Sequence, residues 1–386
     1  MFYVGVDIAK NTHYACVMND KQGILTAPFP FANNEAGFEK FLNSFKKLHK
    51  DDIIVGLEST SVYGENLMSF LTGLDYRIAL INPIETASMR RGKIRNTKTD
   101  KIDSKLICKY LSKEEYRLLH PKELQLLQLR GLCRFRQTLK KSNARLKTQL
   151  VSYLDVSFPE YSTVFKSGIH GKGSYAVLLE FQSASEIAKA NITKLTNLLR
   201  DASRGHFNRE KADRLKLLAK HSVASNSNMS FQIRQTIMQI QLIESQLIDV
   251  ERHICIVFDG FDSIIRTIPG IGSLNGAMII SEIGDVSRFS NPNQLIAFAG
   301  LDPITNQSGN FKAKTTRMSK RGSSVLRYAL VNAAWNVSLN NDTFKNYYDE
   351  KLAQKHRHYA ALGHVAGKLT RVIFKMLKDN VPFDLP

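Results

Sequence analysis

The chain has 386 residues, and 54 Lys and Arg against 35 Asp and Glu give it a formal net charge of +19. Its 43% apolar content is enough for two or three domains with real cores and excludes a disordered polypeptide. Positive charge of this size exceeds what solubility requires. It therefore predicts a polyanionic partner, with nucleic acid favoured over a membrane surface or a merely solvated basic face.

No apolar run approaches the roughly 18 residues that cross a bilayer, and the N-terminus enters a strand pattern without a signal peptide. We therefore expect a cytoplasmic protein with no membrane partner. The cysteines are scattered singly, without the spacing of a zinc site or a disulfide framework. This predicts reduced, buried thiols at Cys16, Cys108, Cys133 and Cys255.

Residues 1–155 are predicted to form an α/β domain. The stretch FYVGVDIA places Phe2, Val4, Val6 and Ile8 on one strand face. YACVMN and ILTAPF, separated by the turn KQG, predict two further strands of an antiparallel meander. Helix and strand patterns then alternate, ending in a helix that contains TKTDKIDSKLI. This order is typical of a ribonuclease-H-like domain.

The middle of the chain is predicted to be helical. One helix, 118–154, carries seven basic residues and no acid between Arg130 and Lys147, and its leucines recur every seven residues at Leu132, Leu139 and Leu146. In a second helix, residues of an apolar a/d seam recur every seven at Ile233, Ile240, Leu247 and Ile254, followed three residues later by Ile243, Val250 and Val257. The seam favours a coiled coil, within the chain or between protomers, over an amphipathic helix packed on its own domain. We assign residues 156–258 to this region, with the helix 118–154 contributing.

Residues 259–386 are predicted to form a mainly helical C-terminal domain. In IIRTIPGIGSLNGAMIISEIGD, Gly270, Gly272 and Gly276 do not follow a strand and miss the dinucleotide-binding spacing by one residue. A helix-hairpin-helix is favoured instead, with backbone N–H groups near Gly270 and Gly272 facing a phosphate. A tight turn between two core helices is the structural alternative.

Four carboxylates from three separate elements are candidates for one metal site. Asp7 lies on the first strand opposite the apolar face, Glu58 ends IIVGLE, and Asp100 and Asp103 are three residues apart on one helix. Hard cations such as Mg²⁺, with Mn²⁺ as a substitute, take oxygen ligands and support phosphoryl transfer. Between Arg90 and Lys109 these two aspartates are the only acids among eight Lys and Arg. Basic residues would hold the nucleic-acid backbone, and the acids would hold the metal.

VDIAK with Asp7, GLES with Glu58, and TKTDKIDSKLI with Asp100 and Asp103 resemble the D-E-D-D signature of bacterial insertion-sequence transposases, a family that includes the Piv-like DNA invertases. The N-terminal domain of that family is similar to the RuvC Holliday-junction resolvase. The segments IPGIGSLNGAMIISEIGD and FAGLDPITNQSGNFKAKTTRMSKRGSSVLRYAL resemble the C-terminal transposase domain of the same family. The resemblance covers roughly residues 1–155 and 260–350.

The resemblance implies a serine nucleophile, because family members are understood as recombinases that join the acids to a C-terminal serine. The matching position is Ser308 in NQSGN, with Ser319 in MSKRG as the competing candidate. No histidine between 303 and 341 could activate the serine, so the acidic site is expected to supply the activation, within one chain or across protomers. The resemblance also implies DNA donor and target partners and a structured guide RNA. The coiled-coil pattern itself predicts a homo-oligomer, dimer or tetramer, joined by that coiled coil.

The remaining candidate nucleic-acid contacts are basic side chains in three stretches, each free to bind phosphate. They are Arg90, Arg91, Lys93, Arg95, Lys140, Lys141, Lys312, Lys314, Arg317, Lys320 and Arg321. The expected function is a DNA transposase or recombinase with a phosphoserine intermediate. Two alternatives are a RuvC-like endonuclease that uses water, and a non-catalytic protein that binds nucleic acid.

Overall fold

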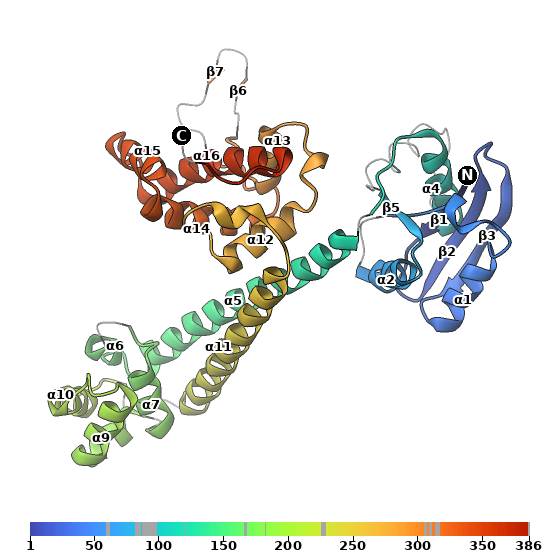
Figure 1. Cartoon of the computed structure of the whole chain (residues 1–386). Coiled ribbons are helices and arrows are strands. Elements are labelled where there is room, and N and C mark those ends of the chain that lie inside the picture. Colours follow the sequence, from blue (N-terminus) through green and yellow to red (C-terminus); the bar gives the residue numbers. More distant parts are fainter. Residues whose placement is uncertain are drawn as a thin grey trace. The chain divides into compact units, whose positions relative to one another are not determined.

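The computed structural model describes residues 1–58, 62–81, 86, 99–119, 121–165, 168–181, 183–224, 229–304, 307–308, 311–312 and 317–384. It divides into two compact units, Met1–Gln128 and Leu129–Pro386 (Figure 1). Unit 1 is a mixed sheet with helices, and unit 2 is helical apart from one short hairpin. In the part of the chain that the structure describes, no helix is both long and apolar enough to cross a membrane.

Unit 1 is built on a five-stranded sheet in the order β3-β2-β1-β4-β5. β1 pairs with β2, and β2 with β3, in antiparallel fashion, whereas β4 lies parallel to both β1 and β5. The strands are β1 (Phe2–Asp7), β2 (Thr12–Asn19), β3 (Ile24–Ala32), β4 (Ile53–Glu58) and β5 (Arg77–Ile81). The helices are α1 (Glu35–Asn43), α2 (Glu65–Gly73) and α4 (Asp100–Lys113).

The two faces of the sheet bury different sets of residues, as the alternation in β1 predicts. Val4 and Val6 belong to a core with aromatic residues of α1 and apolar residues of α2. Tyr3 belongs to a second core, on the opposite face, which is covered by α4. The mixed sheet with helices confirms the α/β part of the sequence-based prediction.

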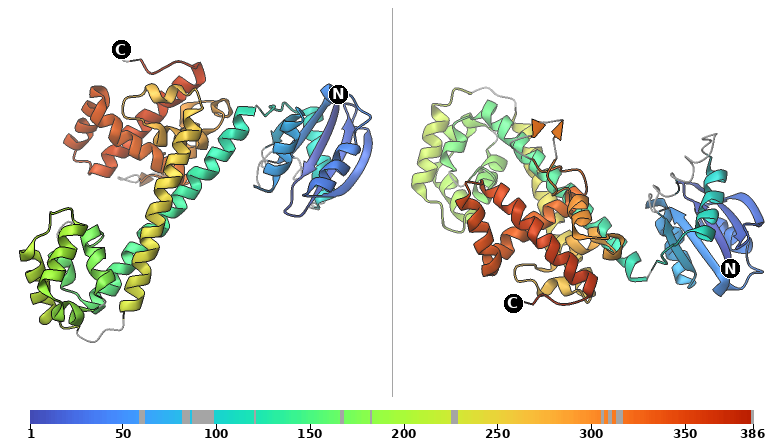
Figure 2. Two further views of the ribbon diagram at one scale, coloured as in Figure 1. Left: turned by 60° about the horizontal axis from the view of Figure 1, so that its bottom comes forward. Right: turned by 90° about the horizontal axis from the view of Figure 1, so that it is seen from above.

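Unit 2 contains the long helix α11 (Ser230–Asp259) and most of a second one, α5 (Pro121–Ser157), whose first residues belong to unit 1. They lie side by side in both Figure 1 and Figure 2, and ion pairs join them at Arg136–Glu251 and Lys147–Glu244. Four of the seven predicted seam positions of α11 are buried, namely Ile233, Ile240, Leu247 and Ile254, and the other three are partly buried, namely Ile243, Val250 and Val257. The apolar seam of α11 is therefore used inside the chain.

The prediction that the first long helix begins at Leu118 is wrong. Leu118 forms a bridge with Ala79 at the edge of the sheet, and the helix begins at Pro121, a residue suited to a first helical turn. Leu132 and Leu146 are only partly buried. The buried positions that recur every seven residues are Leu129, Arg136, Asn143 and Leu150.

A helical bundle connects the far ends of α5 and α11. Its helices are α6 (Tyr161–Val164), α7 (Lys172–Glu180), α8 (Ala184–Lys189), α9 (Ile192–Ala202) and α10 (Arg209–Lys220). They share one apolar core with the ends of the two long helices. Tyr161, fully buried, donates its hydroxyl to the carbonyl of Ser174, which satisfies the one polar group it carries into the core.

The C-terminal part of unit 2 is a cluster of five helices, α12 (Ser273–Ile283), α13 (Pro292–Ala299), α14 (Ser324–Asn340), α15 (Asp342–Ala353) and α16 (His358–Asp379). Between α13 and α14 the chain leaves this cluster and returns, forming the short strands β6 (Gln307–Ser308) and β7 (Phe311–Lys312). Three of the cysteines, Cys16, Cys108 and Cys133, are buried and free; Cys255 is free and partly buried.

Candidate active site

Asp7 and Glu58 end two neighbouring parallel strands. The register of β1 and β4 pairs Val6 with Leu57, so Asp7 and Glu58 follow side by side on strands that lie about 4.8 Å apart. Both side chains alternate away from the core that buries Val6 and Leu57, toward the face that α4 covers. The sheet therefore brings two of the four predicted acids together at one edge.

Two glycines let α4 lie directly on these strands. A Cβ added at Gly5 would lie 2.3 Å from the carbonyl oxygen of Ser104 and 2.7 Å from the backbone nitrogen of Cys108. A Cβ at Gly56 would lie 2.7 Å from a methyl group of Leu111. Each glycine precedes its acid by two residues on the same face, so the same close packing that fixes α4 also fixes the surroundings of Asp7 and Glu58.

The first turn of α4 carries the other two acids. The hydroxyl of Thr99 caps the helix by accepting from the N–H of Ile102, and acids in a first turn are also favoured by the helix dipole. Asp103 is buried, with 4% of its surface exposed, whereas Asp100 is exposed. Because Ser104 touches Gly5, the turn lies at the end of β1 where Asp7 stands. Only Asp103 thus projects into the packed region, and Asp100 lies at its rim.

The donor chemistry of this site suits a hard divalent cation, since all four groups are carboxylates. Among the described residues, however, no group of three or more His, Cys, Asp or Glu side chains lies close enough to hold a metal ion. Glu58 accepts a hydrogen bond from the hydroxyl of Thr86, a buried residue that sequence reasoning missed. The described residues thus place acids on adjacent elements, but they do not form a complete set of metal ligands.

His13 is a second residue that sequence reasoning missed. It is fully buried against Phe31 and Phe38, and its Nδ1 accepts the N–H of Ala9, two residues after Asp7, at 3.2 Å. Burial lowers the pKa of this imidazole, against the effect of a hydrogen bond with Asn33. The neutral ring therefore fixes the turn that follows Asp7.

The predicted nucleophile lies at the end of the excursion between α13 and α14. Backbone bonds close its stem, from the N–H of Ile304 to the carbonyl of Arg317 and from the N–H of Ser319 to the carbonyl of Asp302. Farther out, the backbone of Ser308 in β6 pairs with Phe311 in β7. The hydroxyl of the competing Ser319 donates to the carboxylate of Asp302. Ser319 therefore has an evident structural task in the stem.

Several predicted basic contacts border this stem. Lys320 adopts a left-handed φ of 54°, and the adjacent Arg321 and Arg317 are exposed. Lys140 and Lys141 are also exposed, on α5. Lys312 is described only as part of strand β7. The predictions for Arg90, Arg91, Lys93, Arg95 and Lys314 lie outside the described residues.

The glycines of the predicted helix-hairpin-helix have different surroundings. A Cβ at Gly270, whose φ is 94°, would lie 2.7 Å from the backbone of Asn336 in α14, so this position needs glycine for packing. A Cβ added at Gly272 would meet no atom within 4 Å. Gly272 is the N-cap residue of α12, and no side chain caps the helix there. The element before the turn is a four-residue 3-10 helix, Ile264–Thr267, where the sequence suggested an α-helix.

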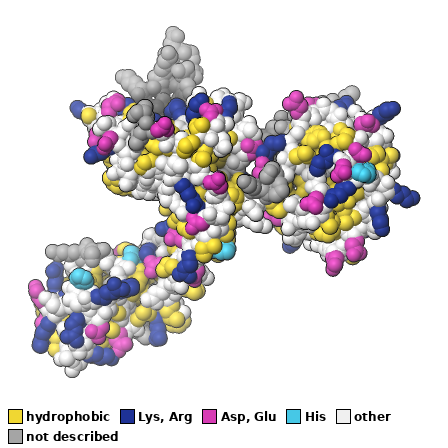
Figure 3. Space-filling view, viewed as in Figure 1, with side chains coloured by type: hydrophobic (Ala, Val, Ile, Leu, Met, Phe, Trp, Pro, Cys, Tyr) yellow, Lys and Arg dark blue, Asp and Glu magenta, His cyan; other side chains and the backbone are white. Residues whose placement is uncertain are grey.

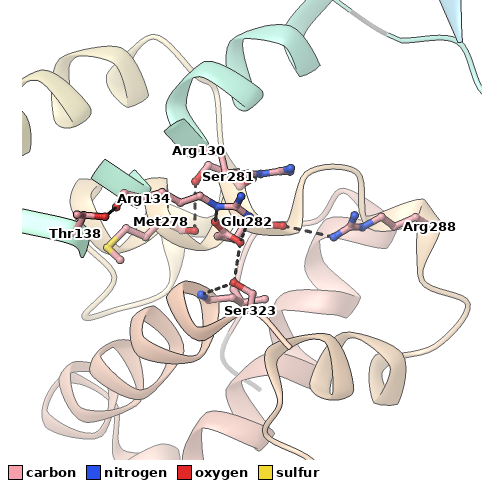
Figure 4. Close-up of polar contacts among 9 residues, drawn as sticks. Arg130, Arg134, Thr138, Met278, Ser281, Glu282, Arg288 and Ser323 are labelled. Carbon is pink, nitrogen blue, oxygen red and sulfur yellow. Dashed lines mark hydrogen bonds and ion pairs between the residues drawn. The ribbon is translucent and has the colours of Figure 1, made fainter. Parts of the chain in front are cut away.

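A buried carboxylate ties α5 to the start of α14 (Figure 4). Glu282, 1% exposed on α12, accepts from Arg134 at 2.7 and 3.2 Å and from the hydroxyl of Ser323 at 2.7 Å. Ser323 in turn caps α14 by accepting from the N–H of Leu326. Burial raises the pKa of Glu282, but bonds from Arg134 and Ser323 and the charge of Arg130 lower it to a greater extent. The carboxylate therefore stays ionised and fixes the end of the serine-bearing excursion.

Two family models match the chain. Residues 4–159 match the DEDD transposase model of the IS110 group, and residues 262–349 match the model described as the transposase IS116/IS110/IS902 family. The chain belongs to this transposase family. The first match contains the four acids, and the second contains Ser308 and the basic stem.

Curated relatives of the transposase match it over most of their length. The pilin gene-inverting protein of Moraxella bovis is 24% identical over 387 residues, covering 99% of this chain and 97% of the relative. The transposase for insertion sequence element IS1328 of Yersinia enterocolitica is 21% identical, with 98% of each chain covered. The mini-circle putative transposase for IS117 of Streptomyces coelicolor is 26% identical and covers 80% of this chain and 77% of the relative. The transposase is thus similar along its whole length to proteins of mobile elements and to a DNA-inverting protein.

Proposed function

We propose that this insertion-sequence transposase cuts and rejoins DNA strands through two groups, the acids Asp7, Glu58, Asp100 and Asp103, and the nucleophile Ser308. The observation that carries the proposal is the pair of acids ending adjacent parallel strands under the helix that bears the other two. Asp7, Glu58 and Asp103 would hold a divalent cation, Mg²⁺ or Mn²⁺, with Asp100 at the rim. Such a cation would supply Lewis-acid stabilisation of the charge that develops on the phosphoryl oxygens.

The serine forms the covalent link in this proposal. Its Oγ bonds to phosphorus while the bond from phosphorus to the leaving sugar oxygen breaks, and a second strand end later displaces the serine. Arg317, Lys320 and Arg321 would stabilise the extra negative charge on the phosphate. The bond between Ser319 and Asp302 supports Ser308 as the nucleophile, because it assigns Ser319 to the stem.

Charge-neutral, size-matched variants test the acid site. Asp103→Asn and Asp7→Asn remove a ligand charge, so cleavage of labelled DNA should fall by orders of magnitude while binding persists or tightens. Asp20→Asn, an exposed acid in the turn after β2, is the matched control and should cleave normally. Loss of binding in step with loss of cleavage would contradict a metal role. Normal cleavage by a Ser308→Ala variant would favour the alternative in which an endonuclease uses water as the nucleophile.

Partners and assembly complete the proposal. The positive charge of the chain supports DNA and a structured guide RNA as ligands, with Gly272 at a helix-hairpin-helix as one phosphate contact. We also propose a functional division into residues 1–155, 156–258 and 259–386.

For the homo-oligomer, α11 offers a second face opposite its buried seam, with exposed apolar residues at Phe231, Met238, Leu242 and Ile256. Light scattering of the full chain tests this assembly, and a monomeric mass would contradict it.

A further inference from the structure

Four aromatic rings form a cluster on the surface of the C-terminal helices. Trp335 of α14 meets Tyr348 of α15 at 5.8 Å and His358 of α16 at 5.2 Å between ring centroids. His358 also contacts Tyr359 at 4.9 Å, and its Nδ1 lies 2.7 Å from the hydroxyl of Tyr348. All these contacts are edge-on, at 63° to 85° between ring planes. The hydrogen bond and the three helices therefore hold the rings in place.

The cluster keeps aromatic surface open to solvent. Trp335 is 38% exposed and Tyr359 is 78% exposed, values far above those of the aromatic residues in the cores. Tyr328 lies about two turns before Trp335 on the same face of α14, and it is 36% exposed. An aromatic ring held in place by edge contacts and open on one side is the arrangement on which a flat, apolar group can stack.

The chain around the cluster is strongly basic. Between Glu350 and Asp379 there is no acid, whereas there are seven Lys and Arg and three His. Residues 352–360, which include the end of α15, the connecting turn 354–357 and the start of α16, are all exposed. In the part of the chain that the structure describes, neither Lys355 nor Arg357 forms an ion pair. Asp349 and Glu350 follow Tyr348 in α15, and Glu350 is paired with Lys351, but the turn that faces solvent beside His358 carries Lys355 and Arg357.

Lys355 adds a backbone observation. Its φ is 64°, in the left-handed region where a residue with a Cβ costs about 1–2 kcal/mol and glycine or asparagine is usual. The left-handed residue ends α15: the N–H of Lys355 donates to the carbonyl of Leu352, and the N–H of His356 donates to the carbonyl of Lys351. Figure 3 shows Lys and Arg spread over the visible faces of the molecule, so charge alone does not locate a site. The site is located by the combination of cations without an ion pair and aromatic rings that are open to solvent.

We propose that this surface, defined by Trp335, Tyr348, His358 and Tyr359 with the turn 352–357, binds unpaired bases of single-stranded nucleic acid. Bases would stack on the open rings while Lys355 and Arg357 contact the adjacent phosphates. An acidic protein partner would use the cations of the turn alone, whereas a single strand uses both the cations and the open rings. His358 and Tyr359 also lie beyond residue 349, where the family match ends.

The position of the single tryptophan makes the inference directly measurable. Trp335 is the only Trp of the chain, so its intrinsic fluorescence reports on this surface alone. Titrating the full chain with a single-stranded oligonucleotide should quench that fluorescence, in parallel with an anisotropy rise of the labelled strand. An abasic strand of equal length keeps the phosphates and lacks the bases, so it should quench little. A blunt duplex should behave like the abasic strand, because its bases are already stacked.

Variants locate the effect. Tyr359→Ala should weaken single-strand binding roughly tenfold, as loss of one stacked base does, while Tyr359→Phe retains the ring and should bind as the wild type does. Phe135→Ala is the matched control, because Phe135 is an exposed ring, 50% exposed, on α5. Ser308→Ala should quench normally, so failure of the serine mechanism would be distinguishable from failure of this inference.

Deoxyribose and ribose strands of one sequence distinguish the source of the bases. Quenching by both supports the proposal, and a tighter ribose strand would identify RNA through its 2′-hydroxyl groups. Equal quenching by the abasic strand would overturn it, since phosphates alone would then suffice. Binding without any quenching would place the single strand elsewhere. A Trp335 emission that responds only to protein concentration would overturn it in favour of a second copy covering the rings.

Discussion

Replacing Gly5 with alanine should separate α4 from the strand that carries Asp7. The new Cβ would lie 2.3 Å from the carbonyl oxygen of Ser104, about 1 Å short of the 3.4 Å at which ordinary contact begins. The obstacle is the backbone of a helical turn, so no rotamer change relieves it and the helix must retreat. Overpacking of this kind costs about 1–3 kcal/mol. Since Asp103 precedes Ser104, the same retreat should move a candidate ligand and lower DNA cleavage.

Two other glycines of unit 1 calibrate the effect. A Cβ at Gly56 would meet methyl groups of Leu111 and Ile107, which can rotate away, so Gly56→Ala should cost less than Gly5→Ala. A Cβ at Gly73, in the last turn of α2, would meet nothing within 4 Å. Gly73→Ala should therefore be neutral or stabilise by up to about 1 kcal/mol.

Urea unfolding, together with hydrogen exchange of the α4 amides, measures this ranking in the full chain. The expected result for Gly5→Ala is faster exchange across residues 100–113, reduced stability and weaker cleavage, with DNA binding retained. The reasoning would be refuted if Gly5→Ala matched Gly73→Ala in stability and left α4 protection unchanged.

Three further changes test other parts of the molecule. Leu247→Asp puts a charge into the buried seam and should cost several kcal/mol in urea unfolding, whereas Ile248→Asp, at an exposed position of α11 outside the proposed assembly face, should be nearly neutral. Because the pKa of Glu282 is lowered in the folded protein, its ionised form stabilises the fold above pH about 4.5, and this stabilisation is lost as the pH falls through the folded-state pKa. Glu282→Gln should therefore lower thermal stability at neutral pH, and its stability should fall less steeply than that of the wild type as the pH is lowered. An acid branch equal to that of the wild type would assign the loss to other groups. Replacing Lys140 and Lys141 with alanine should weaken binding to all DNA sequences and reduce the salt slope by about one unit per lost phosphate contact, and an unchanged slope would mean that they only solvate α5.

Local periodicity was enough to predict the part of the fold that carries the acids. Alternation in FYVGVD and IIVGLE predicts both strands, and each acid falls where the apolar alternation ends. The repeated spacing of Gly5 to Asp7 and Gly56 to Glu58 was a further signal, because two glycines on one face indicate a helix lying close to the sheet. The seam of α11 was equally visible, since its positions are apolar except for the buried Thr236.

Buried polar residues were not predictable in this way. Arg136 and Asn143 occupy buried heptad positions of α5, and Arg136 is stabilised there by Glu251, a residue more than a hundred positions away. Glu282 resembles a surface acid in ISEIGD, and its burial depends on Arg134 and Ser323 from other elements. Burial of a charge is decided by its partners, and partners distant in sequence leave no periodic pattern.

The most direct test of the account is the detection of a covalent protein–DNA link that depends on Ser308. Labelled DNA is incubated with protein and Mg²⁺, and denaturing gels score a band that protease removes. The account predicts this band for the wild type, and predicts its loss together with cleavage in Ser308→Ala and in Asp7→Asn, with both retained in Ser319→Ala. Full cleavage by Ser308→Ala, with no linked band in the wild type, would contradict the serine mechanism and favour hydrolysis by water; loss only in Ser319→Ala would show that the stem serine is the nucleophile.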